Sequence, residues 1–335
     1  MSQPAQNLWF AGQAAHARQR ERHGIRRLSR ILGGSLLLVC GLQQLYGLLV
    51  TALSVSLIPK HPLWEVVLSL AGTVLLLTPG ALLGLRLLSP WEQNQALPFG
   101  RPFAHNGRRG ALLALAVIFA GMMVCLAGSS VSGLIAGFAQ DHGIRFEAPA
   151  LSAAADAPEF LLRILSTAIA PAVIEELLLR GVILQPLRRY GDAFAVLISA
   201  LLFALLHQNL LQAPMAFISG LALGYAAVWS GSLWPGIILH FLNNAASVTI
   251  TQLLAQLPEA RTDRFVRLYG LTVYALGLLG ALYLLLNRKR LPAANRPFLN
   301  TGRLRLTGRF LFGSLPMGIV LALLLASFAL TTHSG

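Results

Sequence analysis

The chain has 335 residues, of which 56% are hydrophobic and only 11% are charged, and its formal net charge is +14. A soluble globular domain carries about 25% charged residues, so this composition excludes a soluble enzyme, a nucleic-acid-binding domain and a disordered regulator. It predicts an all-α, polytopic membrane protein that has the lipid bilayer as a partner and binds no nucleic acid. The two cysteines, Cys40 and Cys125, lie in separate apolar segments and indicate no disulfide framework.

The first 30 residues are polar and rich in arginine, and they are expected to form a basic cytoplasmic tail. They lack the pattern of a cleavable signal, and the apolar run that follows is of full membrane length. The arginines between positions 18 and 30 either fix the topology or bind anionic lipid head groups.

A membrane-spanning helix needs about 20 apolar residues, and runs of this kind predict a bundle of about eight to nine transmembrane helices. We expect three membrane regions after the tail: N-terminal helices in 31–157, a core in 158–255, and C-terminal helices with a basic cytoplasmic linker in 256–335. The expected spans, in chain order, are 31–57, 63–88, 111–138, 159–187, 193–208, 211–229, 233–255, 266–287 and 310–332.

Lysine and arginine are distributed unevenly between the two sides of this arrangement. Nineteen of the 26 basic residues fall in segments that a nine-span arrangement places on one side, namely 18–30, 86–109, 188–189 and 288–309. Basic loops stay in the cytoplasm, so we expect a cytoplasmic N-terminus in a multi-pass protein of the plasma (inner) membrane.

Ionisable side chains deep in a span cost about 2.5–3.5 kcal/mol on insertion scales, which makes them candidates for function. Glu175 and Glu176 are the acidic residues deep in an apolar run, and His207 and His240 are the corresponding histidines. All four fall between positions 175 and 240, and this concentration is the main functional signal in the sequence.

The fourth span contains Pro171, which is expected to kink the helix, followed by the two glutamates. Glu176 and Arg180 are four residues apart in the order that favours an ion pair, and they serve either the structure or the site. Glu175 has no local partner, which suits a general base in a region of low dielectric.

Two further helices supply polar faces. Phe203 and His207 are four residues apart, with His207 either an interhelical hydrogen-bonding residue or part of a site and Phe203 more suited to packing. His240 and Asn244 also share a helix face, where a histidine and an amide donor can bind an oxyanion or join helices. The small residues Gly220 and Gly224 permit close helix approach.

The sequences EELLLR (Glu175 to Arg180), FALLH (Phe203 to His207) and HFLNN (His240 to Asn244) resemble three signature motifs, EExxxR, FxxxH and HxxxN. These are the motifs of the CAAX prenyl protease 2 and bacteriocin-processing (CPBP, or Abi) family of intramembrane proteases. The resemblance covers about residues 158–250.

The resemblance implies a membrane-embedded peptidase that cleaves a membrane-associated protein or peptide, as a glutamate-type enzyme or a metalloendopeptidase. Glu175 and His207 would activate water, and His240 and Asn244 would stabilise the oxyanion, with Glu176 and Arg180 in support. No cofactor is favoured, because the sequence lacks HExxH. Zinc is the alternative, and Glu175, His207 and His240 would then be its three ligands in an open site.

Two other functions fit the same residues. A membrane immunity protein or scaffold would bind a peptide or partner without using Glu175 or His207 as catalysts. A proton-coupled transporter would relay protons through intramembrane Glu and His, but it predicts inverted repeats that the sequence does not show.

Overall fold

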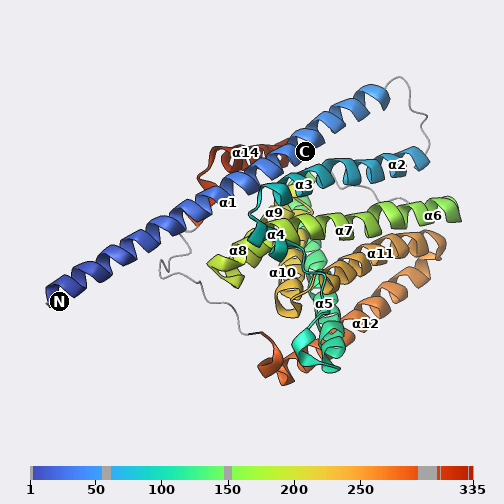
Figure 1. Cartoon of the computed structure of the whole chain (residues 1–335). Coiled ribbons are helices and arrows are strands. Elements are labelled where there is room, and N and C mark those ends of the chain that lie inside the picture. Colours follow the sequence, from blue (N-terminus) through green and yellow to red (C-terminus); the bar gives the residue numbers. More distant parts are fainter. Residues whose placement is uncertain are drawn as a thin grey trace.

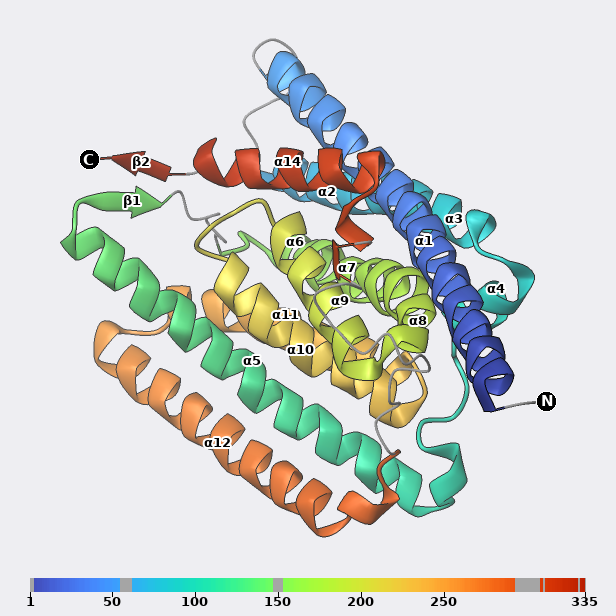
Figure 2. The same cartoon turned by 90° about the vertical axis from the view of Figure 1, so that its left-hand side faces the viewer.

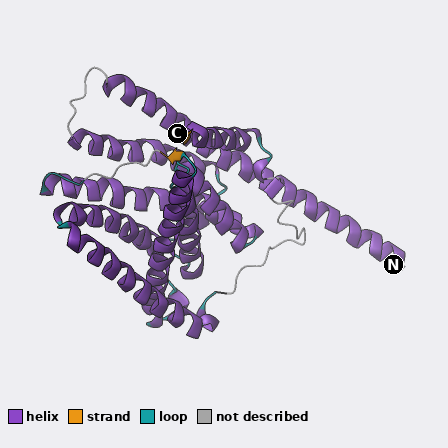
Figure 3. Ribbon diagram, turned by 180° about the vertical axis from the view of Figure 1, so that it is seen from behind, coloured by secondary structure: helices purple, strands orange, loops and turns teal. Residues whose placement is uncertain are grey.

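The structure is a computed structural model that describes residues 3–54, 62–146, 153–292, 308–309, 311–330 and 332–334. Within these ranges the chain is almost entirely helical (Figure 3), which confirms the predicted all-α class. A short antiparallel pair of strands, β1 (Ile144–Phe146) and β2 (Thr332–Ser334), is the exception in the described part of the chain. Several positions used above lie outside the described residues: 55–57 of the first expected span, 293–307 of the basic linker, and 310 and 331 of the last expected span.

The long helix α1 (Gln3–Ser54) runs along one side of the molecule and extends beyond the bundle at its N-terminal end (Figure 1). The expected basic tail is therefore helical from Gln3 onward and continuous with the first span. Helix α14 (Leu315–Leu330) lies against α1 in both views (Figures 1 and 2). Gly33 makes this approach possible, because a Cβ atom at that position would lie 2.6 Å from the backbone nitrogen of Met317.

The second span is a continuous helix built from α2 (Pro62–Gly72), the π-helical segment η1 (Thr73–Leu77) and α3 (Thr78–Leu87). The short helix α4 (Pro90–Ala96) follows and begins with a capping box between Ser89 and Glu92. The buried Glu92 also accepts a hydrogen bond from Arg27 of α1 at 2.9 Å and lies 3.4 Å from Nη1 of Arg189. These ion pairs join α1 to the end of the fourth span.

The fourth span is one helix from 157 to 187, close to the expected 159–187. Its parts are α6 (Ala157–Arg163), η3 (Ile164–Ile169), α7 (Ala170–Glu176), η4 (Leu177–Ile183) and α8 (Leu184–Leu187), of which η3 and η4 are π-helical. Pro171 is the second residue of α7, which begins directly after η3. A proline lacks the backbone donor for a regular helical turn, and π-helical turns often occur inside helices at functional sites.

Three helices pack around the fourth span: α9 (Asp192–Leu206), α10 (Ala213–Ser230) and α11 (Trp234–Gln256). Gly220 and Gly224 of α10 face α9, where added Cβ atoms would lie 2.9 Å from Cα of Ala200 and 2.9 Å from Cγ1 of Val196. The two glycines thus permit the close approach of α9 and α10 that their spacing predicted.

The remaining pair, α5 (Arg109–Asp141) and α12 (Glu259–Leu286), lies side by side along one edge of the molecule (Figure 2). Short 3-10 turns at η2 (Ala104–Asn106), η5 (Arg188–Tyr190) and η6 (Arg288–Arg290) complete the described elements.

Six helices in the described ranges are long and apolar enough to cross a membrane, so the chain is a multi-pass helical membrane protein. Each of the other three expected segments also coincides with a helix. The fourth span carries Glu175, Glu176 and Arg180 in its middle, and α9 and α14 are apolar but shorter. The six spanning helices are Gln19–Ala52, Val66–Leu87, Arg109–Asp141, Ala213–Ser230, Trp234–Gln256 and Arg261–Leu286.

Candidate active site

The two adjacent glutamates at the end of α7 have different surroundings. The side chain of Glu176 is completely buried, whereas that of Glu175 is 23% exposed. Successive residues of a helix point about 100° apart, so one of the pair faces the packed interior and the other faces a cavity. The sequence predicted different partners for the two glutamates; their different exposure comes from the structure.

Glu176 forms the expected ion pair with Arg180. Nη1 of Arg180 donates to Oε1 of Glu176 at 2.7 Å, and neither side chain is exposed. The guanidinium group also donates through Nη2 to the carbonyl of Gly220 at 3.3 Å and lies 4.6 Å from the ring centroid of Phe203. Arg180 thus connects the fourth span to α10 and α9, and the pair neutralises a charge that the bundle interior would otherwise exclude.

His240 of α11 contacts both glutamates. Its Nδ1 atom lies 3.1 Å from Oε1 of Glu176, and its Nε2 atom lies 3.8 Å from Oε2 of Glu175. A carboxylate only accepts hydrogen bonds, so Nδ1 of His240 is the donor to Glu176. The buried ion pair therefore fixes the orientation of this imidazole and directs Nε2 towards Glu175.

His207 follows the last residue of α9, and the chain turns away at Gln208, whose φ is +50°. The sequence placed His207 within the span; the helix ends one residue earlier. Nδ1 of His207 lies 2.8 Å from the carbonyl oxygen of Phe203 and donates to it, which leaves Nε2 without a hydrogen in the neutral imidazole. The ring of Phe203 stands edge-on to His207 with 4.8 Å between centroids, and 5.7 Å from the ring of His240.

Asn244 lies one turn beyond His240 on α11. Its Nδ2 atom donates to the carbonyl of Thr167 at 3.0 Å, and its Oδ1 atom accepts from Nδ2 of Asn243 at 3.2 Å. Thr167 belongs to the π-helical segment η3. One N–H of the Asn244 amide is thus used to join α11 to the fourth span, and the second remains for another acceptor.

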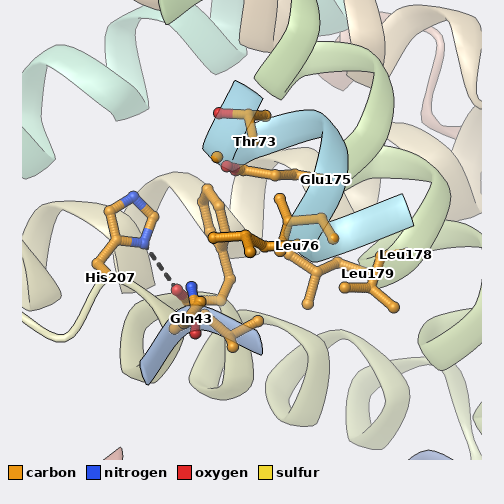
Figure 4. A pocket seen from close by; sticks show the side chains of 11 residues that line it. Gln43, Thr73, Leu76, Glu175, Leu178, Leu179 and His207 are labelled. Atoms are coloured by element: carbon orange, nitrogen blue, oxygen red, sulfur yellow. Dashed lines mark hydrogen bonds between the residues drawn. The ribbon is translucent and has the colours of Figure 1, made fainter. Parts of the chain in front are cut away.

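A cavity of about 440 Å³ is lined by Glu175, His207, His240 and Asn244 together. A second cavity of about 280 Å³ shares Glu175 and His207 with the first. Figure 4 shows Glu175 and His207 at this second cavity, with Gln43 and Leu76 also on its wall. The helices therefore gather the four residues, which lie up to 69 positions apart in the chain, around one cavity, and two of them also line the second.

Several lining residues were not anticipated from the sequence. Thr73 of η1 lines both cavities, Ser69 of α2 lines the larger one, and Gln43 of α1 lines the smaller one. They come from the first two spans, for which the sequence suggested no role in the site. The polar i,i+4 pair of Ser69 and Thr73 in an apolar run was the available signal. Serine, threonine and amide groups on the wall suit a cavity that holds water.

The described residues contain no group of three or more histidine, cysteine, aspartate or glutamate side chains arranged to hold a metal ion. Of the zinc ligands considered from the sequence, His240 uses Nδ1 on Glu176 and His207 uses Nδ1 on a backbone carbonyl. Both histidines keep Nε2 available, as zinc-bound histidines usually do, so the zinc alternative with Glu175, His207 and His240 as ligands stays a prediction.

Residues 157–246 match a family model described as type II CAAX prenyl endopeptidase Rce1-like. The matched segment begins at α6 and ends in α11, so it contains all three motifs and the walls that carry Glu175, His207, His240 and Asn244. The match confirms the resemblance drawn from the motifs: over these residues the chain is similar to CAAX-protease-type membrane endopeptidases of the CPBP family. No curated protein and no solved structure matches the chain.

Proposed function

We propose that the chain is an intramembrane peptidase in which Glu175 and His207 activate a water molecule and His240 and Asn244 stabilise the oxyanion. Its substrate is a membrane-associated protein or peptide. The observation that carries this proposal is the 440 Å³ cavity on which all four side chains lie, inside the segment that matches the endopeptidase family.

Glu175 is the general base. It has no arginine or lysine partner among the ion pairs of the described residues, and it faces the cavity while its neighbour Glu176 is used by Arg180 and His240. His207 assists it, because its Nδ1–H group is held by the carbonyl of Phe203 and its Nε2 atom is free to accept from water.

The oxyanion site is formed by the other two residues. His240 donates to Glu176 through Nδ1, and in its protonated form it also donates through Nε2. Asn244 contributes the N–H that Thr167 does not use. Donors fixed in this way before the reaction stabilise the negative charge that develops in the transition state.

Hydrolysis then runs in two steps. The water oxygen attacks the carbonyl carbon of the peptide bond while Glu175 takes one water proton, and the carbonyl oxygen becomes an oxyanion that His240 and Asn244 bind. When this intermediate collapses, the C–N bond breaks and the proton on Glu175 passes to the leaving nitrogen. His207 takes the remaining proton as the new carboxylate forms.

Glu175→Gln tests the assignment, since it keeps the size of the side chain and removes the base. In the purified full chain, reconstituted in lipid and given membrane-anchored peptides that include a prenylated CAAX peptide, cleavage should fall at least about 100-fold. Asp263→Asn on α12 is the matched control, because it makes the same change at an exposed position. Undiminished cleavage by a correctly inserted Glu175→Gln protein would refute the proposal.

The same variant separates the peptidase from a non-catalytic scaffold. A scaffold or immunity protein keeps its biological effect when Glu175 and His207 are replaced, provided that the protein inserts and accumulates normally. A peptidase loses the effect together with cleavage.

We also propose a cytoplasmic N-terminus and a plasma (inner) membrane location, supported by the basic residues of the segments 18–30, 86–109, 188–189 and 288–309. Reporter fusions in the loop before α5 and in the segment between α5 and α6 test the orientation, since the two sites should report opposite sides of the membrane.

A further inference from the structure

A second kind of hollow lies away from the four polar residues, between α5, α10 and α12. Its volume is about 490 Å³, and apart from Arg288 its lining consists of apolar and aromatic side chains. Four of the lining residues are alanines, whose short side chains leave room in the hollow: Ala120, Ala222, Ala226 and Ala281. We call this hollow the α5–α12 groove.

The walls of the groove are fixed by close packing. A Cβ atom at Gly280 of α12 would lie 2.7 Å from the carbonyl oxygen of Ala116, and one at Gly277 would lie 2.3 Å from Cβ of Met123. The two helices therefore approach each other closely along this stretch, and Figure 2 shows them side by side. Leu285, on the rim, is 57% exposed, so the groove opens on the outside of the bundle, where lipid lies.

One end of the groove is strongly basic. Arg288 lines the groove, and Lys289 and Arg290 follow it. Asn106 donates to the backbone carbonyl of Arg290 at 3.2 Å, which brings the loop before α5 and its exposed Arg108 to the same end. The segments 98–112 and 283–292 contain no acidic residue.

Aromatic side chains stand at this end as well. Tyr225 and Trp229 of α10 line the groove in its last turns, with their ring centroids 5.1 Å apart. Tryptophan, tyrosine and basic residues mark the level of the lipid head groups in membrane proteins. The basic segments that end here are those expected on the cytoplasmic side, where anionic lipids are concentrated.

We propose that the α5–α12 groove binds an anionic glycerophospholipid, with an acyl chain in the apolar hollow and the phosphate group at Arg288. The lining offers no polar partners for a peptide backbone, whose burial would leave unsatisfied donors and acceptors. A hydrocarbon chain has none to satisfy. The basic end selects negative head groups over zwitterionic ones, because a basic side chain near the membrane surface attracts anionic lipid.

The proposal is tested by native mass spectrometry of the purified full chain in detergent with phosphatidylglycerol and phosphatidylcholine. We expect phosphatidylglycerol to bind more tightly, and Arg288→Gln to lower its affinity about fivefold. Lys289→Gln is the control, because it removes the same charge one residue away at a side chain that does not line the groove. Its effect should be clearly smaller.

A second variant addresses the hydrocarbon part. Ala281→Phe fills the groove and should reduce the binding of both lipids. If the thermal midpoint of Ala281→Phe without lipid differs from that of the wild type, Ala222→Leu is used in its place. Inorganic phosphate at millimolar concentration should not displace the lipid. The proposal is overturned if the two lipids bind equally well, or if Arg288→Gln and Lys289→Gln lose the same affinity. It is also overturned if a correctly folded variant with a filled groove binds lipid as the wild type does, or if phosphate displaces the lipid. None of these outcomes depends on peptidase activity.

Discussion

Replacing Arg180 by methionine should strongly destabilise the protein. The substitution leaves the carboxylate of Glu176 fully buried, with Nδ1 of His240 as the remaining hydrogen-bond donor to Oε1. The other oxygen, Oε2, has no hydrogen-bond donor even in the wild type. Breaking a buried ion pair by removing one partner costs about 3–5 kcal/mol. The substitution also removes the contacts of Arg180 with the Gly220 carbonyl and the Phe203 ring, so a loss of unfolding free energy within this range is expected.

The double variant Glu176→Gln/Arg180→Met removes both charges and should recover most of this loss. Replacement of an entire buried pair by neutral side chains is often close to neutral. Glu176→Gln alone leaves the guanidinium group unpaired and should cost a similar amount to Arg180→Met. The sum of the two single losses should therefore exceed the loss of the double variant by at least about 2 kcal/mol.

The free energies come from denaturant unfolding of the detergent-solubilised chain, followed by the fluorescence of its five tryptophans and by circular dichroism. Arg188→Met is the comparison, because Arg188 forms an i,i+4 pair with Asp192 in which the arginine is 23% exposed. Its partner Asp192 is only 3% exposed, so this variant should lose more than a surface pair does but less than Arg180→Met, whose pair is fully buried. Additive losses in the Glu176/Arg180 cycle would show that the two charges do not stabilise each other and would refute the reasoning.

Three further outcomes are expected. Glu92→Gln should lower the thermal midpoint at pH 7: burial raises the pKa of this carboxyl, but hydrogen bonds from Ser89 and an arginine of α1 outweigh it and hold the pKa below its ordinary value. The ionised form therefore stabilises the fold above pH of about 4.3, and the difference between wild type and variant should shrink as the pH falls below that value. Gly220→Ala should cost about 1–3 kcal/mol of unfolding free energy through overpacking, whereas Gly133→Ala, with open space at its Cβ position, should be neutral or stabilising. Asn244→Ala should reduce peptidase turnover about 100-fold or more, and Asn243→Ala, which contacts the amide oxygen of Asn244, should reduce it far less; equal effects of the two would refute the oxyanion role.

The fold class follows from the sequence because the bilayer limits what a chain can do. Backbone groups in lipid must be satisfied within the segment, so an apolar run of membrane length forms a helix whatever surrounds it. The segment 111–138, for example, lies within α5. The ion pair of Glu176 and Arg180 was also predictable, because both residues lie on one helix and their spacing alone brings them together.

Contacts between helices needed the tertiary structure. His240 lies 64 positions from Glu176, and only the packing of α11 against α7 shows that its Nδ1 atom is occupied by the ion pair and that Nε2 faces Glu175. The same holds for Thr73 and Gln43, which helix packing brings to the cavity from the first two spans. Hydrophobic periodicity and spacing indicate which face of a helix is polar. Which helix packs against that face depends on the side-chain volumes along the whole interface. Whether a small residue permits close contact or leaves open space therefore depends on the neighbouring helix. Gly220 permits close contact with α9, whereas the alanines of the α5–α12 groove leave space.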